Sequence, residues 1–230
     1  MTDPTASPPP AISRSLFAFA IFYGGMVCIA GVLGNKQVAL GPLSAIGPLV
    51  GLGPLAVEAG IFAFLMLVVT SSSVAELHGR ATANKLVLIG FVPLIFSLLL
   101  SLVILDLPAA HDMDPARLSA FDTIMGGTPR IWLGGILAYG ISTLLNVSIF
   151  SRLKGQEGEK MLWLRSGVAS ALSQIVDTLI FISVAFYGVF PIGELLLGQM
   201  MAKVVLSIIL VPPLIYAFVA LGRRLDAKAI

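Results

Sequence analysis

The feature that most constrains this chain is a series of apolar stretches, each about long enough to cross a lipid bilayer. They fall at residues 15–34, 56–73, 85–105, 131–150, 164–188 and 192–221. Crossing the hydrocarbon core takes roughly 20 residues of α-helix, and the alternating pattern of a lipid-facing β-strand is absent from these stretches. A helix also satisfies its own backbone N–H and C=O groups, which lipid cannot do. The sequence therefore predicts an all-α membrane protein with six transmembrane helices.

Composition agrees with this fold and argues against other classes. Hydrophobic residues make up 57% of the chain and charged residues only 11%. The net charge of +2 is too small to indicate a nucleic-acid partner. We expect the protein to lie in the lipid bilayer and to bind a small molecule. The sequence has no zinc-protease helix, nucleophile elbow or P-loop, so we expect no enzyme. His78 and His111 lack the spacing of a metal site, and we expect neither a metal nor a cofactor.

Basic residues between the stretches predict the orientation. If the six stretches cross in alternation, one side carries Arg14, Arg80, Lys85, Arg152, Lys154, Lys160, Arg165, Arg223, Arg224 and Lys228. Basic loops stay in the cytoplasm, so both termini are predicted to be cytoplasmic. Residues 1–14 are polar and rich in proline, which predicts a disordered cytoplasmic N-terminus. The transmembrane domain is then expected at 15–222 and a cytoplasmic C-terminal tail at 223–230.

One segment interrupts the helical pattern between the first two stretches. Residues 41–55, "GPLSAIGPLVGLGPL", repeat Gly-Pro-Leu three times. Pro42, Pro48 and Pro54 each remove a backbone donor, which makes a regular helix unfavourable. Irregular backbone at membrane depth is tolerated only where protein or a watery cavity surrounds it. The segment is therefore either an outer loop or a re-entrant segment that forms one wall of a binding site.

Polar side chains recur at helical spacing in the last three stretches. The fifth carries Ser166, Ser170, Ser173, Gln174 and Asp177, and the fourth carries Tyr139, Ser142, Thr143 and Asn146. A carboxylate near the bilayer centre costs about 2.5–3.5 kcal/mol on insertion scales, so Asp177 indicates a substrate or proton site. The sixth stretch places Gln199, Lys203 and Ser207 on one face, with Lys203 near the depth of Asp177. A structural Asp177–Lys203 ion pair is the alternative, and the two interpretations are compatible.

The C-terminal half resembles the vitamin uptake transporter family, whose characterised members transport queuosine precursors. The resemblance is most specific in "WLRSGVASALSQIVDTLIF" and matches Trp163, Arg165, Ser173, Asp177, Thr178 and Phe181, followed by Lys203 and Pro213. The N-terminal half matches more loosely, through Lys36, Gly60, Glu76 and Gly79. The resemblance implies a six-span transporter of the bacterial inner membrane.

It also implies a substrate, a 7-deazaguanine base such as 7-cyano- or 7-aminomethyl-7-deazaguanine. Asp177 and Glu76 would then accept hydrogen bonds from the amidine edge of the base. Gln174, Asn146 and Lys203 would donate to it, and aromatic rings would stack on it. The substrate-binding residues expected on this basis are Asp177, Gln174, Asn146, Lys203, Glu76, Thr178, Phe181, Tyr139 and Lys36.

The sequence departs from the family's usual pattern at three places. Leu65 stands where members commonly have proline, Ser71 and Ser72 replace a Thr-Asp pair, and Asn146 replaces an aspartate. Two customary carboxylates are thus neutral here, which leaves a changed substrate open. The alternatives are a substrate-binding membrane subunit or a transporter for another flat heterocyclic vitamin or nucleobase, and a membrane scaffold without a ligand. A homodimer is also left open.

Overall fold

Long helices account for most of the structure. The computed structural model describes residues 12–157 and 162–227, without the side chains of 143–144, 146–157, 162–171, 173 and 207–208. In chain order the elements are α1 (Arg14–Leu33), β1 (Gln37–Ala39), the 3₁₀ helix η1 (Gly41–Ala45), α2 (Ile46–Leu49), β2 (Ala56–Glu58), α3 (Gly60–His78), α4 (Arg80–Asp106), α5 (Pro115–Glu157), α6 (Leu162–Phe186), α7 (Ile192–Ile209) and α8 (Val211–Ala227). The prediction of an all-α membrane protein is confirmed, with two three-residue strands as an addition.

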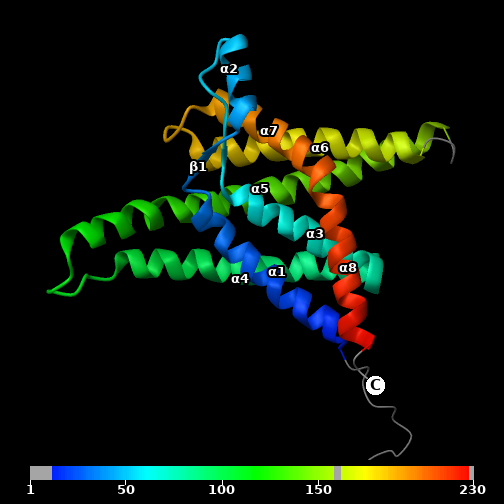
Figure 1. The fold of residues 1–230 in the computed structure, drawn as a ribbon, viewed down its shortest axis with the longest axis horizontal. Coiled ribbons are helices and arrows are strands. Elements are labelled where there is room, and N and C mark those ends of the chain that lie inside the picture. The colour runs from blue at the N-terminus through cyan, green and yellow to red at the C-terminus, as the bar shows by residue number, and fades with distance from the viewer. Residues whose placement is uncertain (1–11, 158–161, 228–230) are drawn as a thin grey trace, which may run out of the picture.

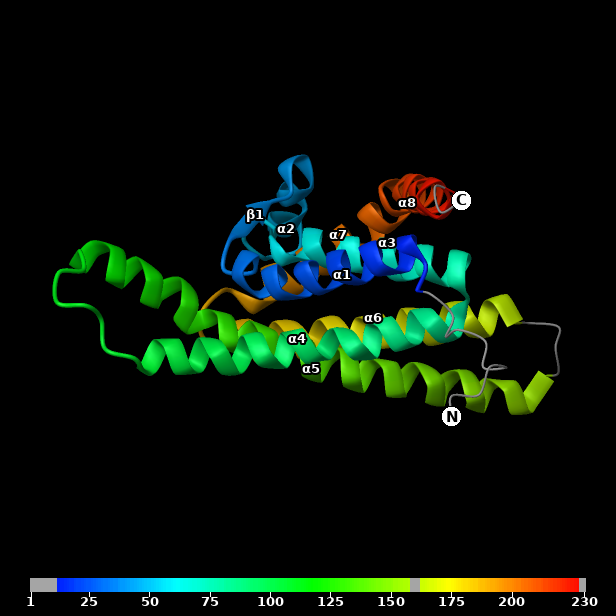
Figure 2. The same cartoon turned by 90° about the horizontal axis from the view of Figure 1, so that it is seen from below.

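The helices form two layers. Figure 2 shows α4, α5 and α6 in one layer, with α1 and α3 lying across them. α1 crosses α4 obliquely (Figure 1). α7 and α8 are the last two helices of the chain, and both contact α3. α5 begins at Pro115, so much of the chain between the predicted stretches 85–105 and 131–150 is also helical. Its start is capped by Asp114, whose Oδ1 accepts a hydrogen bond from the Ala116 N–H at 3.0 Å.

Three helices in the described part of the chain are long and apolar enough to cross a membrane. These are α1, α3 and α4, and the bent pair α7–α8 makes a fourth if it is one span. Many apolar side chains of α4 face outward, with Leu88 66% and Phe96 68% exposed, as expected of a helix in contact with lipid. The chain is thus a multi-pass membrane protein, while the count of six spans stays a prediction.

The Gly-Pro-Leu segment folds into a small structure that packs against α7. β1 and β2 pair antiparallel, with Val38 opposite Val57, and η1 and α2 fill the connection between them. The Ser44 hydroxyl holds the segment closed, because its Oγ accepts from the Leu40 N–H at 2.8 Å and donates to the Leu55 carbonyl at 2.7 Å. β2 therefore ends directly before α3, and this places the Glu58 side chain at the start of that helix.

The sixth predicted stretch is two helices rather than one. α7 and α8 meet at Leu210 with a bend of 52°. Pro212 and Pro213 lie in the first turn of α8 and lack the N–H groups that would continue the hydrogen bonds of α7. Proline is therefore the physical cause of the break. α8 continues to Ala227, so helical structure extends into the predicted tail.

A polar cluster joins three helix ends on one side of the molecule. Ser15 at the start of α1 is fully buried, and its hydroxyl lies 2.7 Å from both Nε2 of His78 and Oδ2 of Asp226. The backbone N–H of Ser15 donates to the other oxygen of Asp226 at 2.9 Å. The start of α1, the end of α3 and the end of α8 are thus held together.

Candidate functional site

A cavity of about 240 Å³ lies between the two layers of helices. Its walls are mainly apolar and aromatic, with Phe64 from α3, Phe91 from α4 and Phe181 from α6 among the lining residues. Tyr139 of α5 also lines it and packs against Phe91 with ring centroids 5.2 Å apart. A cavity of this size with flat side chains in its walls suits a planar ring.

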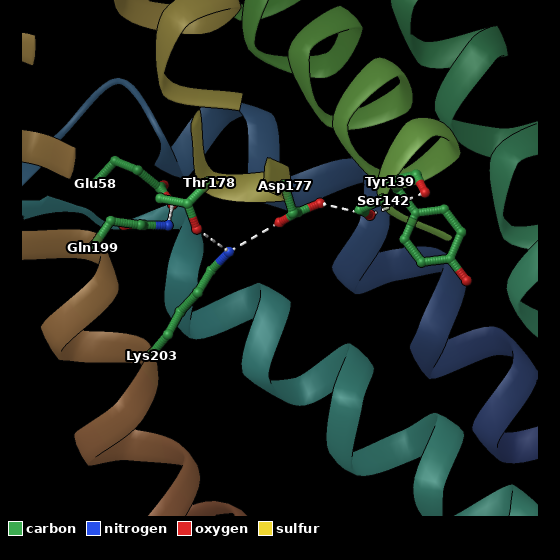
Figure 3. Close-up of polar contacts among 7 residues, drawn as sticks. All are labelled: Glu58, Tyr139, Ser142, Asp177, Thr178, Gln199 and Lys203. Carbon is green, nitrogen blue, oxygen red and sulfur yellow. Dashed lines mark hydrogen bonds and ion pairs between the residues drawn. The ribbon is translucent and has the colours of Figure 1, made fainter. Parts of the chain in front are cut away.

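Polar side chains on four elements form a band along this cavity. Its members are Glu58 of β2, Gln199 and Lys203 of α7, Asp177 and Thr178 of α6, and Ser142 of α5 (Figure 3). Glu58, Asp177, Gln199 and Lys203 line the cavity themselves. The band contains two carboxylates in different surroundings, and each is described in turn.

Asp177 is held by an ion pair. Lys203 Nζ lies 2.9 Å from Asp177 Oδ2 and donates a second hydrogen bond to Thr178 Oγ1 at 3.0 Å. The Ser142 hydroxyl donates to the other oxygen, Oδ1, at 3.2 Å. The lysine ammonium also lies 5.2 Å from the ring centre of Phe64, within cation–π range. The predicted Asp177–Lys203 ion pair is confirmed, and it joins α6 to α7 inside the bundle.

Glu58 has no such ion pair among the described residues. Its side chain is only 3% exposed, and its Oε1 accepts a hydrogen bond from Gln199 Nε2 at 3.1 Å. The N–H groups of Gly60 and Ile61 at the first turn of α3 and the charge of Lys203 also act on this carboxyl. Its Oε2 is nevertheless buried without a completed hydrogen bond. Gln199 presents its NH₂ group to Glu58.

Two further polar atoms at the cavity have no completed hydrogen bond. Gln199 is 2% exposed, and its Oε1 is buried without a donor. The indole Nε1 of Trp132, a cavity-lining residue of α5, is likewise buried without an acceptor. The Trp132 ring packs against Gly31 of α1, where any Cβ would collide with it. Unsatisfied buried polar atoms are uncommon in proteins. Of the four among the described side chains, three belong to residues that line this cavity, and the fourth is Gln37 Nε2 on β1.

The structure brings together about half of the predicted substrate-binding residues. Tyr139, Asp177, Phe181 and Lys203 line the cavity, and Thr178 contacts Lys203 beside them. The side chain of Asn146 lies outside the described residues.

Three of the predicted residues lie elsewhere. Gln174, Glu76 and Lys36 are exposed and do not line the cavity. Gln174 precedes Asp177 by three residues, which turns it about 60° around the α6 axis and moves it about 4.5 Å along that axis. Spacing on one helix therefore did not decide which of its polar residues reach the cavity.

The sequence interpretation missed Glu58, Gln199 and Trp132 as cavity residues. Glu58 was visible as an acidic residue at the start of an apolar stretch, and Gln199 as a polar residue one turn before Lys203. Neither signal shows that the two meet, because 141 positions separate them. Among the described side chains, no three metal-ligating residues lie together.

Comparisons with known proteins point to one family. Residues 58–218 match the family model described as "Putative vitamin uptake transporter". The chain is 35% identical over 150 residues to a Bacillus subtilis (strain 168) protein named "Probable queuosine precursor transporter". That alignment covers 63% of this chain, and the chain spans 63% of the length of that relative. None of the solved structures gave a match to the chain.

Proposed function

Because the chain belongs to the vitamin uptake transporter family, we propose that it imports a queuosine precursor across the bacterial inner membrane. The substrates would be 7-cyano- and 7-aminomethyl-7-deazaguanine, taken up for the salvage of queuosine in tRNA. The name of the Bacillus subtilis relative and its 35% identity support this substrate class. The transport domain would comprise residues 15–222.

The observation that carries the proposal is the polar band on an otherwise apolar cavity. All of its members, from Glu58 to Lys203, fall inside the range that the family model matches. A 7-deazaguanine ring is flat and carries N–H donors on one edge and a carbonyl acceptor beside them. Aromatic walls, buried acceptors and a lysine ammonium complement such a ring.

The proposed binding residues follow from this cavity. Asp177, Lys203, Phe181 and Tyr139 would contact the substrate, and Thr178 would position the lysine. Asn146 on α5 stays a predicted contact. Gln174, Glu76 and Lys36 also stay predictions, and their exposed positions make a role along the entry path more favourable than one in the cavity.

The cluster of helix ends supports the proposed orientation. Ser15, His78 and Asp226 hold the start of α1, the end of α3 and the end of α8 together. Arg14, Arg80, Arg223 and Arg224 adjoin these residues in the sequence, so these basic residues lie at one end of the molecule. That end would face the cytoplasm, with both termini, under the positive-inside rule.

A salvage experiment tests the proposal. A bacterial strain that neither makes nor imports the precursors is given the gene for this protein, or an empty vector, and low concentrations of either base. We expect queuosine in tRNA only when the protein is present. Equal queuosine in both strains, or none in either with the protein correctly inserted, would contradict the proposal.

Reconstitution in liposomes distinguishes the proposed transporter from the main alternative, a substrate-binding subunit. The purified protein is placed in liposomes and uptake of labelled 7-aminomethyl-7-deazaguanine is followed. Transport by the protein alone is expected. Tight binding without any transport would instead identify a substrate-binding subunit that works with a separate energising module.

A further inference from the structure

Two hydrogen-bond acceptors without donors lie on the same pair of side chains. Glu58 Oε2 and Gln199 Oε1 are both buried, and neither has a completed hydrogen bond with a described residue, although Glu58 Oε1 and Gln199 Nε2 bond to each other. Both residues line the cavity, and Figure 3 shows their side chains meeting end to end. Leaving acceptors buried and unpaired is unfavourable, so a donor from outside the described chain would relieve both.

Asp177 is less suited to the role of acceptor than its position in α6 predicts. One of its oxygens receives Lys203 at 2.9 Å and the other receives Ser142 at 3.2 Å. A substrate that used both oxygens would have to displace the ammonium from a largely buried ion pair. Glu58 needs no such exchange, because no cation or hydroxyl of the described residues is bonded to its Oε2.

We infer that Glu58 and Gln199 form the acceptor pair that binds the donor edge of the substrate, an inference that rests on the proposed transport of a guanine-type base. The ring N–H and the adjacent exocyclic amino group of such a base are neighbouring donors. The exocyclic amino group donates to Glu58 Oε2 and the ring N–H donates to Gln199 Oε1. Lys203 then lies on the same side of the cavity to donate to an acceptor of the base.

Close backbone packing holds the Glu58 carboxyl in place. A Cβ on Gly60 would lie 2.5 Å from Glu58 Oε2 and 2.6 Å from the Ala30 carbonyl oxygen of α1. On the other side, a Cβ on Gly198 of α7 would collide with the Ala56 carbonyl oxygen of β2. Glycine at both positions lets β2 approach α7 and α1, which brings Glu58 against Gln199. The acceptor pair is therefore built by the packing of three elements, and a flexible side chain alone does not produce it.

Binding of two bases that differ in a single group tests the inference. The purified full-length protein is titrated calorimetrically with 7-deazaguanine and with 7-deazahypoxanthine, which lacks only the exocyclic amino group. The wild type is expected to prefer 7-deazaguanine by about tenfold or more, the effect of a hydrogen bond to a charged group. Glu58→Gln adds a donor facing the donor edge, so its preference is expected to fall to near unity.

Matched variants separate a binding role from a structural one. Glu194→Gln makes the same change at a carboxyl that bonds the Gly53 N–H, and it is expected to keep the preference. Asp177→Asn is expected to keep it as well, whatever it does to transport. If Glu58→Gln does not fold, Gln199→Leu removes the acceptor of the ring N–H and is expected to weaken the binding of both bases by a similar factor; unchanged affinity for both would overturn the inference.

The outcomes distinguish this inference from the proposed function. A wild type that binds and transports 7-deazaguanine precursors, with a Glu58→Gln variant that keeps the full preference, overturns the inference alone. Loss of the preference in Asp177→Asn but not in Glu58→Gln returns the acceptor role to Asp177. A wild type that binds none of the 7-deazapurines overturns the proposed function, and the inference with it.

Discussion

Asp177 and Glu58 are carboxylates on the same cavity, and their surroundings differ. Asp177 has Lys203 as an ion-pair partner and Ser142 as a hydrogen-bond donor. Glu58 is more deeply buried, yet among the described residues its only completed side-chain hydrogen bond to another side chain is with Gln199. The first carboxylate is stabilised by the protein itself and ties α5, α6 and α7 together. The second retains an open acceptor, which is what a ligand site requires and a purely structural site does not.

Breaking the ion pair is expected to have the largest effect on stability. Lys203→Met leaves Asp177 buried without its cation, a change that typically costs about 3–5 kcal/mol. Thermal unfolding of the purified protein in detergent measures this as a large fall in Tm. The double variant Asp177→Asn/Lys203→Met is expected to recover much of the loss. A double variant no more stable than Lys203→Met would show that Asp177 is not the origin of the cost.

Displacing the Glu58 carboxyl by a substitution at Gly60 is expected to have the second largest effect on stability. Gly60→Ala forces a methyl group against the Glu58 carboxyl and the Ala30 carbonyl, which costs about 1–3 kcal/mol as overpacking. Binding of 7-deazaguanine should weaken together with stability. Gly25→Ala on α1 is the control, because a Cβ there meets no atom within 4 Å. Equal Tm values for the two variants would contradict the close packing around Glu58.

Removing the hydroxyl beside Asp177 should have a smaller effect. Ser142→Ala deletes the hydrogen bond to Oδ1 and leaves the ion pair with Lys203 in place. The loss is expected to be about 1 kcal/mol, typical of one hydrogen bond. Chemical or thermal unfolding measures it, with Ser97→Ala as a control whose hydroxyl bonds only to the Cys28 thiol in the described structure. A loss as large as that of Lys203→Met would mean that Ser142 does more than donate to Asp177.

The smallest stability change is expected at Glu58 itself. Glu58→Gln replaces a carboxyl that has no ion pair among the described residues. The variant loses mainly the interaction of this carboxyl with the start of α3, worth below about 1 kcal/mol. Its Tm in the absence of ligand should stay near that of the wild type, while ligand-induced stabilisation by 7-aminomethyl-7-deazaguanine should fall. A large fall in Tm without ligand would make Glu58 a structural carboxylate like Asp177.

The sequence predicted one of these two carboxylates well. Asp177 lies in the middle of an apolar stretch, and the helical spacing of Lys203 in the next stretch predicted its partner, which the structure confirms. The sequence did not predict that Glu58 lines the cavity, because a residue at the edge of an apolar stretch is ordinarily solvated. The strands β1 and β2 turn this edge inward, and the connection between them contacts α7 through the hydrogen bond from the Gly53 N–H to Glu194, which no local pattern encodes.

The positions of the apolar helical stretches were determined by the sequence alone, whereas the break between α7 and α8 was not predicted. Twenty apolar residues in lipid form a helix because backbone groups find no other partner. Pro93 and Pro129 are kept inside α4 and α5, whereas the pair Pro212 and Pro213 lies where α7 gives way to α8. The tertiary structure decided which polar side chains share the cavity. Gln174 and Gln199 both lie on predicted polar helix faces, yet only Gln199 reaches Glu58. Which side chains reach the cavity depends on the rotation and the contacts of each helix. These in turn depend on side chains that are far apart in the chain.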